Sequence, residues 1–271
     1  MTRHLVLVLA MLAIAACRRD AAAPDSGPAR PGTAAGPAVV TTPGGLQDVV
    51  ETTPRYVIGI SYPKSAANYP GLASALRAYA DASRRELMQA VEGLGNDKPT
   101  APYELSLSFT ELLDSPALVA VAADGYNYTG GAHGAPLIAR FVWLPREQKM
   151  LTAQELVPDA KGWQAISDFV REQLHTALSQ RVDADDVPAA DRADMLKSAG
   201  QMIDEGTQPS AQSFAQFEPV MGDDGRIAAL RFVFPPYQVG PYADGTQTVE
   251  VPAEVLLPHV AAEYRGLFHG A

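Results

Sequence analysis

The chain has 271 residues, with 21 lysine and arginine residues against 31 aspartate and glutamate residues, so its formal net charge is −10 at pH 7. This acidic balance disfavours nucleic acids and anionic lipid surfaces and would suit a basic protein partner, although acidic surfaces also serve solubility alone. The five histidines are scattered and form no zinc signature, and the sequence contains no nucleophile elbow and no EF-hand loop. The sequence therefore indicates no metal, no cofactor and no catalytic residue.

Residues 1–16 are typical of a bacterial lipoprotein signal peptide. Arg3 and His4 precede an apolar run from Leu5 to Ala16, which is too short to span a bilayer. The run leads into Cys17, and the resulting Ile-Ala-Ala-Cys resembles a lipobox, in which the cysteine receives the lipid. An ordinary secretory signal that leaves a free thiol is the alternative. Because removal of the signal peptide removes Arg3, the mature chain would carry a net charge of −11.

Residues 17–54 are predicted to be a disordered tether, lipidated at Cys17. Alanine, proline, glycine, threonine and serine dominate this stretch, so it cannot bury enough apolar surface to offset the entropy lost on ordering. Arg18 follows the cysteine where an aspartate would favour retention in the inner membrane. We therefore expect a protein that is lipid-anchored at the periplasmic face of the outer membrane and touches the membrane only through its lipid.

Residues 55–150 are predicted to form an N-terminal α+β subdomain. Apolar residues alternate with a period of two, which predicts strands over residues 55–62, 103–109, 118–128 and 136–144. Between the first two strands, apolar side chains recur at steps of three and four residues, which predicts a helix that stops at residues 93–95. The helix positions are Leu72, Leu76, Tyr79, Ser83, Leu87 and Val91.

Residues 151–271 are predicted to form a second, C-terminal α+β subdomain. An amphipathic helix is expected around Trp163 to Leu174, short helices over 182–205, and a closing helix around Val255 to Val260. Strands are expected over 214–220 and 227–234, joined by a turn at 222–225, and over 246–251. Strands in pairs interrupted by helices predict an α+β fold with mainly antiparallel sheets, packed helices and two small subdomains.

Two loops stand out as candidate partner-binding segments. The segment from residue 126 to 134 contains three glycines around one histidine, and the segment from 234 to 245 combines proline and glycine with two tyrosines. The alternative is that both loops hold the fold together. The candidate partner-binding residues are Tyr126, Tyr128, Gly130, Gly131, His133, Tyr237, Tyr242 and Asp244.

The two loops resemble a known extracytoplasmic domain. The T-G-G-A-H-G loop and the later F-x-x-Y-x-x-G-P-Y-A-x-G run are similar to motifs of the domain shared by the lysozyme-sensing anti-sigma factor RsiV and the peptidoglycan deacetylase PdaC, where it is non-catalytic. The resemblance covers roughly residue 56 to the C-terminus and implies a location outside the membrane and, as in the sensor, recognition of lysozyme. We expect no anti-sigma signalling and no deacetylase activity, because neither a sigma-binding segment nor a deacetylase domain is recognised.

The first functional hypothesis is a periplasmic lipoprotein, not an enzyme, that binds and inhibits a lysozyme-like peptidoglycan hydrolase. The hydrolase would be basic, and the role would be immunity or defence against lysozyme. The alternative is a non-catalytic module that binds peptidoglycan or another envelope glycan through its tyrosines. A third possibility is an enzyme that uses His133 as a general base.

Overall fold

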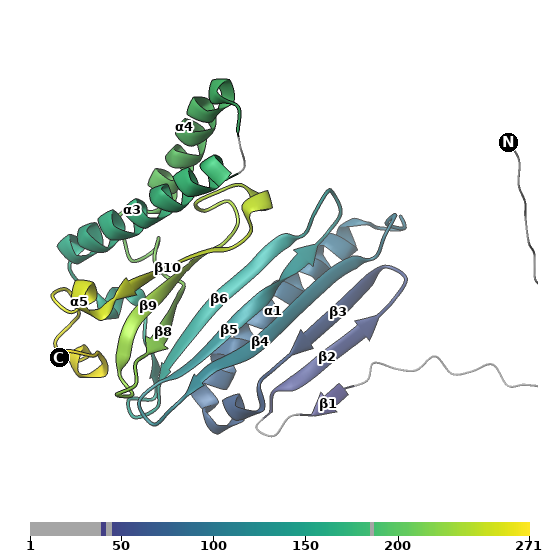
Figure 1. Cartoon of the computed structure of the whole chain (residues 1–271). Coiled ribbons are helices and arrows are strands. Elements are labelled where there is room, and N and C mark those ends of the chain that lie inside the picture. Colours follow the sequence, from purple (N-terminus) through teal and green to yellow (C-terminus); the bar gives the residue numbers. More distant parts are fainter. Residues whose placement is uncertain (1–38, 42–44, 185–186) are drawn as a thin grey trace, which may run out of the picture. The chain divides into compact units, whose positions relative to one another are not determined.

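The computed structural model describes residues 39–41, 45–184 and 187–271, which form two mainly antiparallel sheets with packed helices (Figure 1). The predicted α+β fold class is confirmed. The predicted signal peptide, Cys17 and most of the predicted tether lie outside the described residues. Residues Gly36–Ala271 belong to one compact unit, so the two predicted subdomains are parts of a single body.

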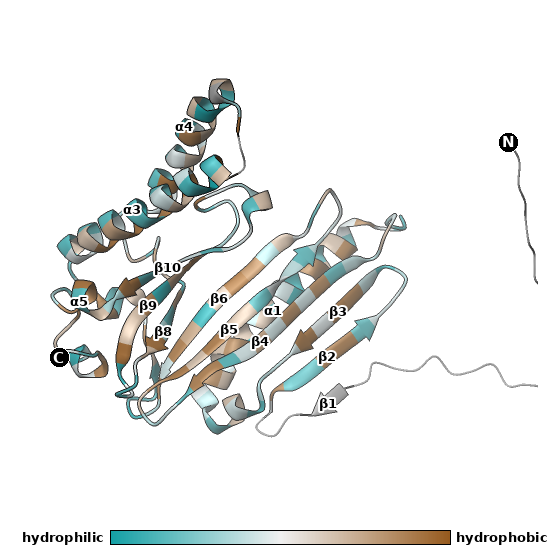
Figure 2. Ribbon diagram, in the orientation of Figure 1, coloured by the Kyte–Doolittle hydropathy of each residue, from teal (hydrophilic) through white to brown (hydrophobic). Residues whose placement is uncertain are grey.

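The larger sheet has seven strands in the order β1 to β7. All neighbouring strands are antiparallel except β3 and β4, which run parallel. Figure 2 shows hydrophobic and hydrophilic residues alternating along β3, β4 and β6, as the sequence predicted. The strands are β1 (Val39–Thr41), β2 (Gln47–Thr52), β3 (Tyr56–Ser61), β4 (Tyr103–Asp114), β5 (Val119–Tyr128), β6 (Ala135–Leu144) and β7 (Lys149–Met150).

The predicted tether is wrong over its last residues, because β2 is an ordered strand inside the range 17–54. It pairs with β3 from Val49 opposite Ile60 to Thr52 opposite Val57. The side chain of Leu46, just before the strand, is fully buried. The apolar side chains of Leu46 and Val49 are enough to order this segment, because the edge of the larger sheet supplies the backbone hydrogen bonds.

The long helix α1 (Pro70–Gly93) provides the crossover that the parallel strands β3 and β4 require, and a short 3-10 helix η1 (Lys64–Asn68) leads into it. The predicted apolar face is confirmed, since five of its six positions are buried and Tyr79 packs against the same core. Gly71 is needed in the first turn, because a Cβ there would lie 2.2 Å from the indole of Trp143. The helix therefore covers one face of the sheet at close range.

The second half of the chain builds a three-stranded antiparallel sheet in the order β10-β9-β8, packed against α3. Its core contains Trp163, Phe214 and Phe232, and it also includes Leu118 and Val142 from the first half of the chain. The elements are α2 (Ala153–Leu156), α3 (Ala160–Ala184), α4 (Ala189–Gly206), β8 (Phe217–Met221), β9 (Ile227–Phe234), η2 (Tyr242–Asp244), β10 (Gln247–Pro252), α5 (Ala253–Leu256) and η3 (Arg265–Leu267).

Two predicted helices differ from those observed. The short helices expected up to residue 205 are one 18-residue helix, α4, which packs on the core beside α3 through the buried Ile203. The expected closing helix stops at Leu256, because Pro258 has no backbone N–H to continue it, and Val260 is buried outside any helix. No helix among the described residues has the length and apolar character needed to cross a bilayer.

The two sheets meet where β6 lies beside β8 (Figure 1). The backbone N–H of Arg140 donates to Gln216 Oε1 at 2.7 Å, and its guanidinium Nε donates to Glu218 Oε1 at 2.5 Å. The side chains of Arg140 and Glu218 are only 8% and 11% exposed, and each has a second ionic partner, Asp124 at 3.0 Å from Arg140 and Arg231 at 3.3 Å from Glu218. This ion pair holds the β5–β6 hairpin against the second sheet.

Candidate functional site

The two loops singled out in the sequence meet in the structure. The ring of His133, from the β5–β6 loop, stacks on the ring of Tyr242 with a centroid distance of 3.8 Å and an interplanar angle of 13°. Its Nε2 atom lies 3.0 Å from the hydroxyl of Tyr237, and the two tyrosine rings are 5.7 Å apart. We call His133, Tyr237 and Tyr242 the aromatic cluster.

Glycines shape the β5–β6 loop that carries His133. Gly130 and Gly131 have φ values of +102° and +94°, which residues with a side chain rarely adopt. The Tyr128 hydroxyl donates to the Gly131 carbonyl at 3.3 Å and ties the loop to the end of β5. The predicted glycines therefore act through the backbone, by turning the chain so that His133 faces the other loop.

The β9–β10 loop holds Tyr237 in a strained conformation. Its φ is +74°, a left-handed value that costs a residue with a side chain about 1–2 kcal/mol. The backbone N–H of Tyr237 donates to the Gly240 carbonyl at 2.9 Å. The side-chain Nε2 of Gln238 donates to the carbonyls of Gly206 and Ser213 at 2.9 and 2.8 Å. Strain that the surrounding structure maintains in this way is common at functional sites.

Asp244 ties the same loop to helix α3. Its carboxylate lies 2.8 Å from the guanidinium of Arg181, and its side chain is 18% exposed. The described contacts of Asp244 therefore position the neighbouring Tyr242 in the aromatic cluster. A direct contact of Asp244 with a partner stays a prediction.

Tyr126 lies at the base of the β5–β6 loop and has no described contact with the aromatic cluster. Its hydroxyl donates to Glu104 at 2.5 Å, and this hydrogen bond to a carboxylate raises the pKa of Tyr126. A Cβ at Gly134 would lie 2.9 Å from the Tyr126 ring, so glycine is needed there for close packing. The sequence singled out neither Glu104 nor Arg181, because each is far along the chain from the loop that it holds.

The aromatic cluster is prominent on the surface. Tyr237 is 54% exposed, more than any other large hydrophobic residue in the described part of the chain. Both ring nitrogens of His133 lie near neighbouring groups, Nε2 at the Tyr237 hydroxyl and Nδ1 at 3.3 Å from the Gly134 carbonyl. No group of three or more histidine, cysteine or carboxylate side chains that could hold a metal ion is found within the described ranges. The arrangement offers flat, amphipathic contact surface.

Comparison with known proteins places the two loops in two matched regions. Residues 49–135 match the family model described as Deacetylase PdaC, and residues 156–254 match the model described as Protein of unknown function (DUF3298). His133 lies in the first region, whereas Tyr237 and Tyr242 lie in the second. The aromatic cluster is therefore a contact between the two matched regions.

Several individual proteins are similar to this chain. The chain is 22% identical over 204 residues to the peptidoglycan-N-acetylmuramic acid deacetylase PdaC of Bacillus subtilis, covering 73% of this chain and 39% of the deacetylase. A crystal structure of a DUF3298 family protein from Pseudomonas aeruginosa has a TM-score of 0.54 and 16% identity, covering 87% of this chain and 96% of that one. A DUF3298 member from Bacteroides fragilis has a TM-score of 0.48 and 15% identity, covering 85% and 94%.

The chain spans about two fifths of the length of the curated relative that it matches. The solved structure from Pseudomonas aeruginosa supports the α+β fold. The predicted link to RsiV stays a prediction. The predicted resemblance to PdaC is confirmed, because residues 49–135 match the model described as Deacetylase PdaC and the chain is similar to the PdaC of Bacillus subtilis.

Proposed function

We propose that the chain is a non-catalytic binding protein of the bacterial envelope that docks onto a lysozyme-like peptidoglycan hydrolase and blocks it. The observation that carries this proposal is the aromatic cluster, in which two loops hold the exposed side chain of Tyr237 in a fixed conformation. A tyrosine that is already held in its binding conformation loses little entropy on association. Tyrosine is also enriched among the residues that dominate protein–protein binding energy.

The relatives support a role at peptidoglycan. The curated relative is named for deacetylation of peptidoglycan N-acetylmuramic acid. The region matched by this chain covers 39% of the deacetylase and falls on its non-catalytic part. We therefore expect this chain to share a binding role with the deacetylase and not its catalytic activity. Inhibition, in a role of immunity or lysozyme defence, is the form of binding that we propose.

Charge supports a basic partner. The formal net charge of the chain is −10, and long-range attraction of that size speeds the encounter with a positively charged hydrolase. We expect the association rate to fall as salt rises from low to physiological concentration, because ions screen charges separated by more than about 10 Å. Association that does not change with salt would argue for an apolar or glycan contact.

We further propose that the protein is anchored by a lipid on Cys17 and faces the periplasm from the outer membrane. The lipobox-like sequence before Cys17 supports this location. The variant Cys17→Ser is expected to leave the membrane fraction and to stay folded, because the compact unit begins only at Gly36. Recovery of the Cys17→Ser variant in the outer-membrane fraction would contradict the lipid anchor.

Substitution within the aromatic cluster tests the docking proposal. We expect Tyr242→Ala or His133→Ala to weaken binding to a lysozyme-like hydrolase at least tenfold, which is about 1.4 kcal/mol. Binding would be measured by calorimetry against a panel of lysozymes, with the melting temperature of each variant recorded. Val50→Ala is the matched control, because Val50 is 53% exposed on β2, outside the cluster.

The docking proposal fails if both cluster variants bind as tightly as the control. It also fails for a given loop if the substitution in that loop lowers the melting temperature by several degrees, because the loop would then serve the fold. An unaltered affinity in both variants would point to an interface elsewhere on the acidic surface.

A further inference from the structure

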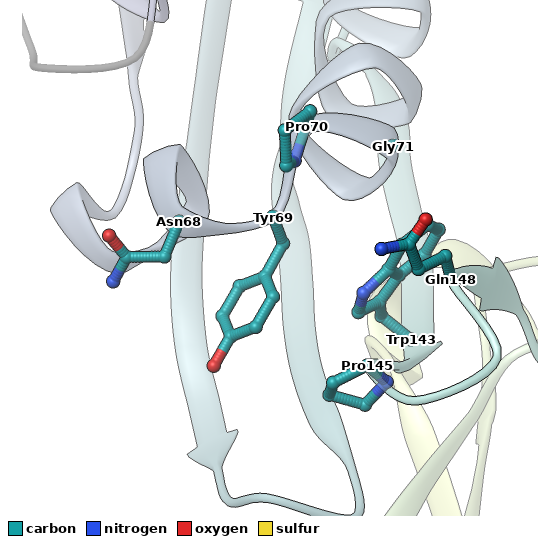
Figure 3. A pocket seen from close by; sticks show the side chains of 7 residues that line it. All are labelled: Asn68, Tyr69, Pro70, Gly71, Trp143, Pro145 and Gln148. Carbon is teal, nitrogen blue, oxygen red and sulfur yellow. The ribbon is translucent and has the colours of Figure 1, made fainter.

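A pocket of about 360 Å³ lies where the beginning of α1 meets the end of β6 (Figure 3). None of the residues in its wall belongs to the aromatic cluster, so it is a separate site. The pocket size lies at the lower end of the range for small-molecule sites and fits one sugar ring better than a chain. The residues that matter here are Asn68, Tyr69, Trp143, Pro145 and Gln148.

Trp143 presents an unused hydrogen-bond donor to this pocket. Its side chain is rigidly held, because the residue is only 6% exposed and Gly71 of α1 sits directly on its ring. In Figure 3 the indole nitrogen lies on the side of the ring that faces Tyr69. The hydrogen bonds within the described residues give the Tyr69 hydroxyl a partner in Asp114, at 2.7 Å, but give none to the indole nitrogen. The indole N–H is therefore free to donate to an acceptor on a ligand in the pocket.

Gln148 is held in a conformation that its residue type disfavours. It is the last residue of the turn between β6 and β7 and has a φ of +52°, where glycine or asparagine would cost less. Its carboxamide has no described hydrogen-bond partner in the protein and lies beside the indole of Trp143 in Figure 3. The retention of a strained glutamine is explained if the side chain has a role in the pocket.

The wall chemistry selects an uncharged, amide-bearing ligand. The wall combines aromatic rings and prolines with the carboxamides of Asn68 and Gln148, and contains no charged side chain. Rings and prolines suit the apolar face of a sugar, and carboxamides suit hydroxyl and amide groups. The Asp114 carboxylate behind Tyr69 disfavours an anionic ligand such as a carboxylated sugar.

We propose that this pocket binds a neutral N-acetylated hexosamine, with the Trp143 indole donating to the carbonyl oxygen of the acetamido group. Gln148 and Asn68 bond the ring hydroxyls, and the rings of Tyr69 and Trp143 contact the apolar parts of the sugar. The site does not depend on the aromatic cluster. Loss of sugar binding therefore leaves the hydrolase proposal standing, and loss of hydrolase binding leaves this one standing.

The indole N–H signals in a ¹H–¹⁵N spectrum test the proposal directly. The chain has two tryptophans, and Trp163 is buried in the other core, so its signal is an internal control. Titration of the compact unit Gly36–Ala271 with N-acetylglucosamine is expected to move the Trp143 signal in a saturable way and leave the Trp163 signal in place. Glucose and glucosamine, which lack the acetyl group, are expected to move it at least tenfold less at equal concentration.

Two variants make the test independent of folding defects. Trp143→Phe removes the donor and keeps an aromatic ring, whereas Gln148→Gly removes the carboxamide and relieves the positive φ, so it folds at least as well as the parent. Each is expected to weaken sugar binding at least fivefold, measured by calorimetry, while Gln164→Ala on α3 leaves it unchanged. An unmoved Trp143 signal, or full affinity in Gln148→Gly, would overturn the site, and equal shifts with glucose would overturn recognition of the acetamido group.

Discussion

Two groups of stacked aromatic rings in this protein have similar stacking geometry but differ in their exposure to solvent. In the second core, Phe214 stacks on Trp163 at 5.6 Å and meets Phe232 edge-on at 5.2 Å, and all three are buried. In the aromatic cluster, His133 stacks on Tyr242 at 3.8 Å, but Tyr237 beside them is more than half exposed. Ring stacking alone therefore does not determine whether a group of rings is buried in the core or exposed on the surface.

The difference lies in the polar groups and the backbone. The buried group is carried by regular elements and their flanks, and its stability comes from area removed from water. The exposed group sits on two loops, and its members are joined through the hydrogen bond between the Tyr237 hydroxyl and His133. One of its members also keeps a left-handed backbone. The left-handed backbone of Tyr237 lowers the stability of the fold, so its presence is better explained by a role in partner binding than by a role in folding.

The largest expected effect comes from truncating one ring in each group. Phe214→Ala is expected to lower the free energy of unfolding by about 3–5 kcal/mol, because it leaves a cavity among buried rings. Tyr242→Ala is expected to lower it by about 1 kcal/mol or less, because its stacking partner is on the surface. Urea denaturation of both variants measures the difference. Equal losses would show that the aromatic cluster is part of the core.

A third aromatic pair gives a pH-dependent contrast with the exposed cluster. Tyr62 stacks on Phe109 at 4.8 Å, and burial raises the pKa of Tyr62 from 10.0 to about 12. Because the folded state holds this proton more tightly than the unfolded state, the stabilisation is complete below pH 10 and is lost as the pH rises towards 12. After allowance for solvent screening, the loss is on the order of 1–2 kcal/mol.

Tyr62→Phe provides the control for this pH effect, since it keeps the stacked ring and removes the titrating hydroxyl. Urea denaturation between pH 9 and 12 is expected to show a steeper loss of stability for the parent than for the variant. Parallel pH profiles for the two proteins would show that Tyr62 ionises as freely in the folded state as in the unfolded chain.

Most of the fold was predictable because its elements are amphipathic. The alternation along β3 to β6 and the steps of three and four along α1 reflect burial of one face, so local pattern and tertiary structure agree. The pattern failed where the partner is non-local. β2 carries too little apolar sequence to predict a strand and is ordered by the sheet edge that β3 offers.

The site was predictable only in parts. Glycines and tyrosines marked both loops, but His133 and Tyr237 are 104 residues apart and no local signal indicates that they touch. Trp143 looked like an ordinary strand residue, because its pocket is made by α1 and by the turn that contains Gln148. Contacts that depend on the packing of distant elements leave no periodic trace in the sequence.

The smallest expected effect concerns the backbone of Tyr237, and it asks whether the exposed cluster is truly strained. At an ordinary exposed position, alanine is at least as stable as glycine, because glycine loses more backbone entropy on folding. At a φ of +74° the order should reverse, since only glycine adopts this conformation without a steric penalty. We expect Tyr237→Gly to be more stable than Tyr237→Ala by about 0.5–1 kcal/mol in thermal or urea unfolding.

Both variants lack the ring and should lose hydrolase binding equally, so stability and binding separate cleanly. A Tyr237→Ala variant that is as stable as Tyr237→Gly would show that the loop relaxes without the tyrosine, and the cluster would then be a consequence of the side chains and not of a backbone held ready by the fold.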